Sequence, residues 1–146
     1  METLFHPVSL ADSTGAIHEF HFRLRDFGEG VALDAFEPGK EYPAGYEFQL
    51  IGDPEADLPV LQGQLLDKMR RALSLKHLRQ GSYGLAIGEL GLVRGMIASD
   101  CAGAGESLPV LVIDGRPVEW EEFGRMLMTF EGSQFKLQIA DQSEEI

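Results

Sequence analysis

The chain has 146 residues, of which 44% are hydrophobic, so it is long enough to bury a full core and we expect one globular domain over residues 1–146. Its formal net charge of −12 opposes general nucleic-acid binding and adsorption to anionic membranes, which both need a positive surface. Cys101 is the only cysteine, which excludes an intrachain disulfide and a thiolate metal cluster within one chain.

The first residues contain no basic segment followed by an apolar run, so we expect no secretory signal. The apolar runs are too short to span a bilayer. Together with the single cysteine, these features predict a cytoplasmic protein of bacterial type.

The N-terminal half predicts an antiparallel meander of three strands. Residues 1–15 read as an irregular lead-in. Apolar and polar side chains alternate over residues 16–25, and strands are also expected at residues 31–37 and 46–50, with short glycine-containing links. Successive strands joined by short links are typical of a meander.

A long helix is expected next, with Asp57 as its N-cap and Pro59 in its first turn. We expect it to run to about Gln80, before Gly81. Its apolar side chains recur at helical spacing and predict one buried stripe: Leu58, Leu61, Leu65, Met69, Ala72 and Leu73.

Residues 81–105 are rich in glycine and the hardest to interpret. Alternation within residues 92–99 predicts one strand, and residues 100–107 predict a loop. The stretch contains neither G-x-x-x-x-G-K-[ST] nor G-x-G-x-x-G, so we predict no nucleotide site there.

The C-terminal part predicts a strand, a turn, a helix and a final strand. Residues 110–113 form a short apolar run that suits a buried strand, and Asp114 and Gly115 form a strong turn dipeptide. We expect the helix to begin after Val118 and to end at a Gly132 cap. The helical spacing predicts one buried face that carries Trp120, Phe123, Leu127 and Phe130, with Met126 beside it.

Residues 135–139 alternate Phe, Lys, Leu, Gln and Ile, and this period of two predicts a half-buried final strand. An acidic tail follows at residues 141–146. Strands and helices are only partly interleaved along the chain. The fold class expected is therefore α+β: the meander, the long helix, two strands, the short helix and the final strand.

The sequence also resembles a bacterial domain family of unknown function. The resemblance rests on the pattern V-I-D-G-R, then W-E-E-F-G-R-M-L, then F-E-G and Q-F-K-L, with V-R-G and H-E-F earlier in the chain. It covers about two thirds of the chain. Glu119 stands where a Ser or Thr N-cap would be expected in this pattern. The resemblance implies a shared fold, and no activity or site residue comes with it.

A concentration of positive charge makes the long helix a candidate binding surface. Five of the twelve basic residues of the chain fall within residues 68–79, with no acid between them: Lys68, Arg70, Arg71, Lys76 and Arg79. In one interpretation they are solvated, with Lys76 and Arg79 complementing the helix C-terminus. In the other they bind an acidic surface: the acidic tail, another subunit or a separate protein.

Carboxylates near the predicted turn form the alternative site. Acid–base chemistry or a divalent cation there would draw on Asp100, Asp114, Arg116, Glu121 and Glu122. The turn itself accounts for Asp114, and the helix dipole accounts for Glu121.

Other candidates are weaker. His18 and His21 lie on opposite faces of the predicted strand, so we predict no shared metal site. Cys101 has no local feature that would lower its pKa. The sequence therefore predicts a non-catalytic binding or protein-interaction module without cofactor or metal, capable of binding a protein or itself. The alternative is a small carboxylate-dependent enzyme.

Overall fold

The computed structural model describes residues 5–99 and 108–146. It contains two helices and three antiparallel sheets, which confirms the α+β class. The chain divides into two compact units, which are described separately below. Unit 1 comprises Met1–Gly39, Glu47–Leu75 and Ala140–Ile146, and unit 2 comprises Lys40–Tyr46 and Lys76–Ile139. The single domain expected from the sequence stays a prediction.

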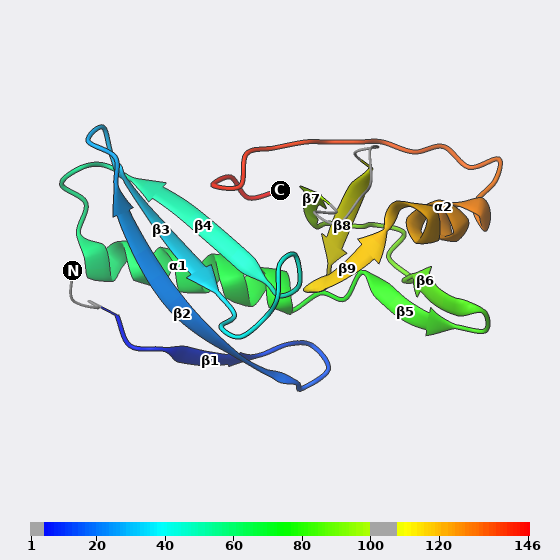
Figure 1. The fold of residues 1–146 in the computed structure, drawn as a ribbon, viewed down its shortest axis with the longest axis horizontal. Coiled ribbons are helices and arrows are strands. Elements are labelled where there is room, and N and C mark those ends of the chain that lie inside the picture. Colours follow the sequence, from blue (N-terminus) through cyan, green and yellow to red (C-terminus); the bar gives the residue numbers. More distant parts are fainter. Residues whose placement is uncertain (1–4, 100–107) are drawn as a thin grey trace. The chain divides into compact units, whose positions relative to one another are not determined.

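Unit 1 is built on a four-stranded antiparallel sheet in the order β1-β2-β3-β4 (Figure 1). The strands are β1 (Val8–Ala11), β2 (Ile17–Asp26), β3 (Val31–Phe36) and β4 (Glu47–Gly52). The meander is confirmed for β2, β3 and β4. The irregular lead-in is wrong for residues 8–11, because β1 pairs with β2 from Val8 opposite Phe20 to Ala11 opposite Ile17.

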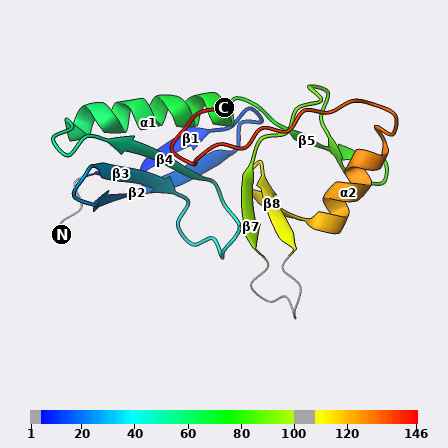
Figure 2. The ribbon, with the colours of Figure 1, turned by 90° about the horizontal axis from the view of Figure 1, so that it is seen from above.

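Helix α1 (Leu58–Leu73) lies against one face of this sheet, and its axis follows the sheet over its whole length (Figures 1 and 2). The Asp57 side chain accepts a hydrogen bond from the Val60 N–H, so the predicted N-cap is confirmed. Most of the predicted stripe is buried: Leu61, Leu65, Met69 and Leu73. These side chains and the sheet residues Phe20, Leu33, Ala35 and Phe48 form the core of unit 1.

The predicted extension of α1 to Gln80 is wrong. The helix ends at Leu73 with Ser74 as C-cap, and β5 (Leu78–Gly81) begins four residues later. The N–H groups of His77 and Leu78 donate to the carboxylate of Asp114, at 2.9–3.1 Å. Because these amides are bound by a side chain distant in sequence, they do not continue the helical ladder.

Unit 2 holds two small antiparallel sheets and α2 (Trp120–Met128). One sheet is the hairpin of β5 and β6 (Gly84–Ile87), which the sequence did not reveal. The other has the order β7-β8-β9, with β7 at Met96–Ser99, β8 at Pro109–Ile113 and β9 at Arg116–Glu119. A Cβ atom at Gly95 would overlap the carbonyl oxygen of Val112, so glycine is needed where the chain enters β7.

The core of unit 2 lies between α2 and these sheets. It consists of Leu78, Ile87, Ile113, Val118 and Met126, with Phe123 packed at its margin. Strand β8 is central, as expected for its apolar run, and the turn at Asp114 and Gly115 joins it to β9. Both turn residues have positive φ, 54° and 75°, which explains the Asp-Gly sequence.

Two expectations about α2 are confirmed and three are wrong. The helix begins after Val118, and Glu119 at the N-cap makes no side-chain capping bond. However, the buried residue is Met126, whereas Trp120 is 45% exposed and Leu127 and Phe130 are also exposed. The C-cap is Thr129, so Gly132 is not the cap and Phe130 lies beyond the helix. With only nine residues, α2 buries one narrow stripe rather than the wide aromatic face.

The predicted final strand is also wrong. Residues 135–139 are extended but belong to no sheet among the described residues, and they follow α2 as a bare ribbon in Figure 1. The side chain of Phe135 is 90% exposed, that of Leu137 76% and that of Ile139 71%. The alternation is present, but no strand lies beside it to accept its backbone hydrogen bonds.

Among the described residues, no helix is long and apolar enough to cross a membrane.

Candidate functional site

The five basic residues are divided between the two units. Lys68, Arg70 and Arg71 belong to α1 in unit 1, whereas Lys76 and Arg79 follow the end of the helix and belong to unit 2. Both residues lie beyond the end of α1 at Leu73, and the idea that they complement the helix C-terminus stays a prediction.

Lys68 is buried, although lysine is rarely buried without a partner. Its Nζ donates to the carbonyl oxygens of Gln49, at 2.8 Å, and Gln142, at 2.9 Å. Burial lowers the pKa of Lys68, and the negative charges of Glu145 and Asp141 oppose that shift only in part. The side chain thus ties both the sheet and the C-terminal tail to α1.

Arg71 binds the acidic tail directly. Its Nε and Nη2 donate to the two carboxylate oxygens of Glu145, at 2.6 and 2.7 Å, in a bidentate pair. Arg70 instead donates to Asp67, one turn earlier on the same helix, at 3.3 Å. Of the partners considered for the basic residues, the acidic tail is the one that the structure brings to Lys68 and Arg71.

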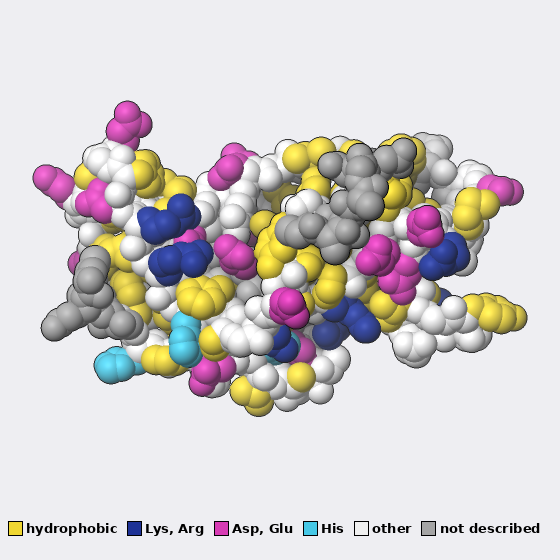
Figure 3. Space-filling view, viewed as in Figure 1, with side chains coloured by type: hydrophobic (Ala, Val, Ile, Leu, Met, Phe, Trp, Pro, Cys, Tyr) yellow, Lys and Arg dark blue, Asp and Glu magenta, His cyan; other side chains and the backbone are white. Residues whose placement is uncertain are grey.

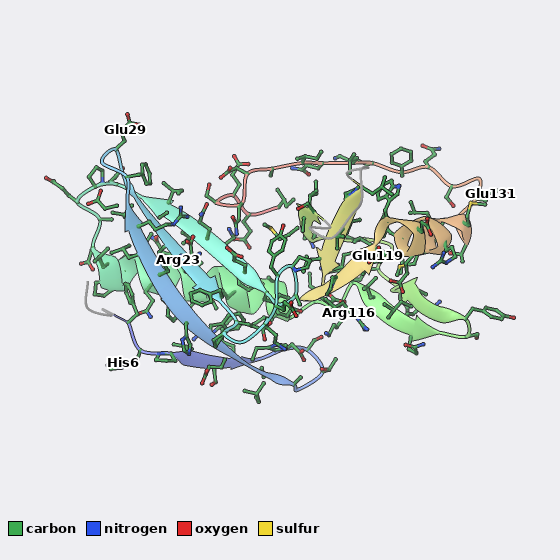
Figure 4. All side chains as sticks on the ribbon, viewed as in Figure 1. His6, Arg23, Glu29, Arg116, Glu119 and Glu131 are labelled. Atoms are coloured by element: carbon green, nitrogen blue, oxygen red, sulfur yellow. The ribbon has the colours of Figure 1, made fainter. Side chains whose placement is uncertain are left out.

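The carboxylates of the alternative site have separate surroundings. Both oxygens of Asp114 accept backbone N–H groups, from His77 and Leu78. Arg116 is exposed on β9, and Glu121 and Glu122 lie in the first turn of α2. Figure 4 marks β9 at Arg116 and Glu119. Asp100 and Cys101 lie outside the described residues.

Unit 1 contains a charged cluster that the sequence analysis missed. Asp34, only 1% exposed, accepts hydrogen bonds from Arg23, Arg25 and Gln49 at 3.0–3.3 Å. Burial raises the pKa of Asp34, but these hydrogen bonds outweigh it and hold the pKa below its usual range. Figure 3 shows Lys and Arg side chains over this sheet face, where Figure 4 labels Arg23. The sequence did contain a signal for this cluster: an aspartate inside an apolar predicted strand, next to a predicted strand with two arginines.

His18 is held between two acids. Its ring nitrogens lie 2.8 Å from Asp12 Oδ2 and 3.1 Å from Glu37 Oε2. Burial lowers the pKa of His18, but the hydrogen bonds to Asp12 and Glu37 outweigh burial and raise the pKa above its ordinary value. His21 lies nearest Glu19 instead, so the two histidines have different partners. His18 therefore links β2 to Asp12 at the end of β1 and to Glu37 at the end of β3.

The most unusual surface of unit 2 is apolar. Many of its large apolar side chains are exposed, and Figure 3 shows hydrophobic side chains on its visible face. Tyr83, at the β5–β6 turn, is fully exposed. Segment 135–139 contributes three highly exposed side chains, because every second side chain in it is apolar and exposed. Among the described residues, the backbone of this segment makes no hydrogen bond.

Comparison with known proteins gives two family matches that divide the chain. The model described as Domain of unknown function (DUF7686) matches residues 2–74, which is half of the chain. The model described as Domain of unknown function (DUF7713) matches residues 77–144. These matches confirm the expected likeness to families of unknown function. No curated protein and no solved structure matches the chain.

Proposed function

We propose that this chain, which belongs to the DUF7686 family of domains of unknown function, is a non-catalytic cytoplasmic protein-interaction module. One observation carries the proposal: segment 135–139 is extended, alternately apolar and exposed. Segments of this kind bind proteins by adding a strand, because backbone hydrogen bonds supply affinity and alternate side chains supply specificity.

Binding of a partner would remove these apolar side chains from water. Burying an exposed Phe, Leu or Ile side chain stabilises a complex by about 1.5–3 kcal/mol each before the cost of association. The largest apolar patch on a typical soluble monomer covers about 300–600 Å² and is often a binding site. Three such side chains at alternate positions therefore favour a state in which a partner covers the segment over one in which it stays in water.

The polar clusters support the same proposal, because each has a structural partner. Asp114 binds two backbone amides, Asp34 binds two arginines, and Arg71 binds Glu145. General acid–base catalysis needs a carboxylate free to exchange a proton with substrate. No described feature favours the alternative of a carboxylate-dependent enzyme.

Capture of a partner tests the proposal. Tagged wild type and Leu137→Asn would be used as baits in an extract of the producing cells, with Tyr83→Asn as a matched control. Tyr83 is at least as exposed as Leu137 but lies outside the segment. We expect a protein, this chain included, to be captured by wild type and by the control but lost with Leu137→Asn.

The captured protein would then be purified and its binding measured by calorimetry. A dissociation constant that Leu137→Asn raises about tenfold or more would agree with the loss of one buried Leu. Equal capture and equal affinity for all three baits would overturn the proposal.

A further inference from the structure

We propose that the partner of segment 135–139 is the same segment of a second copy, paired antiparallel about a twofold axis at Leu137. This inference rests on the proposed function and names its partner. The segment runs as a drawn-out ribbon in Figure 1 and belongs to no helix or sheet, so pairing displaces no existing secondary structure. Antiparallel pairing would bond the backbone N–H and C=O groups of alternate residues in the segment, which make no hydrogen bond among the described residues.

The twofold register suits every side-chain pair. With Leu137 opposite itself, Phe135 faces Ile139 and Lys136 faces Gln138. Aromatic and β-branched side chains form favourable cross-strand pairs, and the lysine meets a neutral partner. All three apolar side chains then lie on one face of the two-stranded ribbon.

Neighbouring registers place unfavourable pairs of side chains opposite each other. A twofold axis at Lys136 places two lysines directly opposite each other, and parallel pairing in register does the same. An axis at Gln138 places Phe135 opposite the acidic Asp141. A shift by a single residue pairs apolar with polar positions. The sequence therefore specifies one register, as an isologous contact requires.

Charge also selects this stretch for contact between copies. Two chains of formal charge −12 repel each other, so self-association needs a surface with few acids. Residues 132–140 carry only one charged side chain, Lys136. In the proposed register, the flanking Asp141 faces Ser133, so no two acids oppose each other along the paired stretch.

The contact is expected to be weak. Three exposed side chains contribute about 400 Å² per copy, on a scale where one aromatic residue buries about 150–250 Å². A standard interface buries roughly 800 Å² per partner. A two-stranded ribbon is also marginal by itself. We therefore expect monomers at low concentration and dimers at high concentration.

Sedimentation tests the inference first. Wild type would be compared with Leu137→Lys and with Tyr83→Lys, from about 5 µM to about 500 µM, a range suited to weak dimers. Because Leu137 faces its own copy, the lysine substitution places two like charges together. We expect wild type and Tyr83→Lys to dimerise and Leu137→Lys to lower the association constant about tenfold or more.

A charge-swap pair tests the register. Phe135→Lys mixed with Ile139→Glu places opposite charges face to face at one position and leaves the other Phe–Ile pair intact. Phe135→Lys mixed with Phe135→Glu has the same charges, but each meets an isoleucine. We expect heterodimers in the first mixture at several times the level in the second. Circular dichroism would confirm that every variant is folded.

The outcomes separate this inference from the proposed function. A wild type that is monomeric throughout, a dimer unaffected by Leu137→Lys, or equal heterodimer levels in both mixtures would overturn self-pairing. The interaction module would still stand if Leu137→Asn released a different, purified binding partner. Unchanged self-association together with unchanged capture would overturn both.

Discussion

Substitution of Asp114 tests the link between the β8–β9 turn and the start of β5. The carboxylate accepts the His77 N–H at 3.0 and 3.1 Å and the Leu78 N–H at 2.9 Å. Both donor residues are buried, so lost bonds are poorly replaced by water. The residue also has a φ of 54°, in the left-handed region.

The two effects can be separated by three variants. Hydrogen bonds to a charged acceptor contribute about 1.5–3 kcal/mol each, and left-handed backbone costs a non-glycine residue about 1–2 kcal/mol. Asp114→Ala loses both bonds and keeps the strain, so we expect a loss of about 3–5 kcal/mol. Asp114→Gly removes the strain and should lose about 1 kcal/mol less. Asp114→Asn keeps an acceptor and tolerates the turn, so about 1–2 kcal/mol is expected.

Chemical denaturation, followed by fluorescence of Trp120, would measure the free energy of unfolding of each variant. The expected order of stability is wild type, Asn, Gly and Ala. An Asn variant as unstable as the Ala variant would refute the role of the carboxylate as acceptor. Losses below about 0.5 kcal/mol in all three would show that the contact with β5 does not stabilise the fold.

Three further predictions concern the core, the paired histidine and the tail. Met126→Ala should cost about 2–4 kcal/mol in denaturation and Trp120→Ala clearly less, because Met126 is buried; equal losses would contradict the packing of α2. The raised pKa of His18 means that its stabilisation is complete below the unfolded value and is lost as pH rises through the folded value. The stability difference between wild type and His18→Gln should therefore shrink as the pH rises from below 6.5, the ordinary value, through the raised folded-state pKa, and a constant difference would refute the pairing. Arg71→Gln should speed carboxypeptidase removal of the tail, whereas Arg70→Gln should not, and equal rates would contradict the bidentate pair.

Local signals in the sequence predicted much of unit 1. The alternation in β2 is strong because one face meets the core and the other meets solvent. The N-cap at Asp57 and the apolar stripe of α1 can also be predicted from neighbouring residues alone. Strand β1 was missed because it has only four residues and because its pairing with β2 is a tertiary feature.

Unit 2 was harder because its main determinant is long-range. The carboxylate of Asp114 binds amides 36 and 37 residues earlier, and this ends the helical pattern before residues 78–81. Periodicity also ranked the aromatic face of α2 above Met126, because it cannot show which side meets the core. The acidic tail was one of the alternatives for the basic residues, but the contacts of Lys68 with Gln142 and of Arg71 with Glu145 required the fold.

Segment 135–139 gives the clearest case of a local pattern without its partner. Its period of two is real, and the described residues of one chain supply no strand beside it. A second copy would supply one. The alternation and the exposure of these side chains are then two aspects of the same binding surface.

Amide hydrogen exchange of residues 135–139 at low and high protein concentration tests this claim most directly. Unpaired amides exchange rapidly, and amides in a strand ladder are protected. We predict rapid exchange in dilute protein and protection in concentrated protein, alternating along the segment and lost in Leu137→Lys. Rapid exchange at both concentrations would contradict self-pairing. Protection that is independent of dilution would contradict an exposed, unpaired segment.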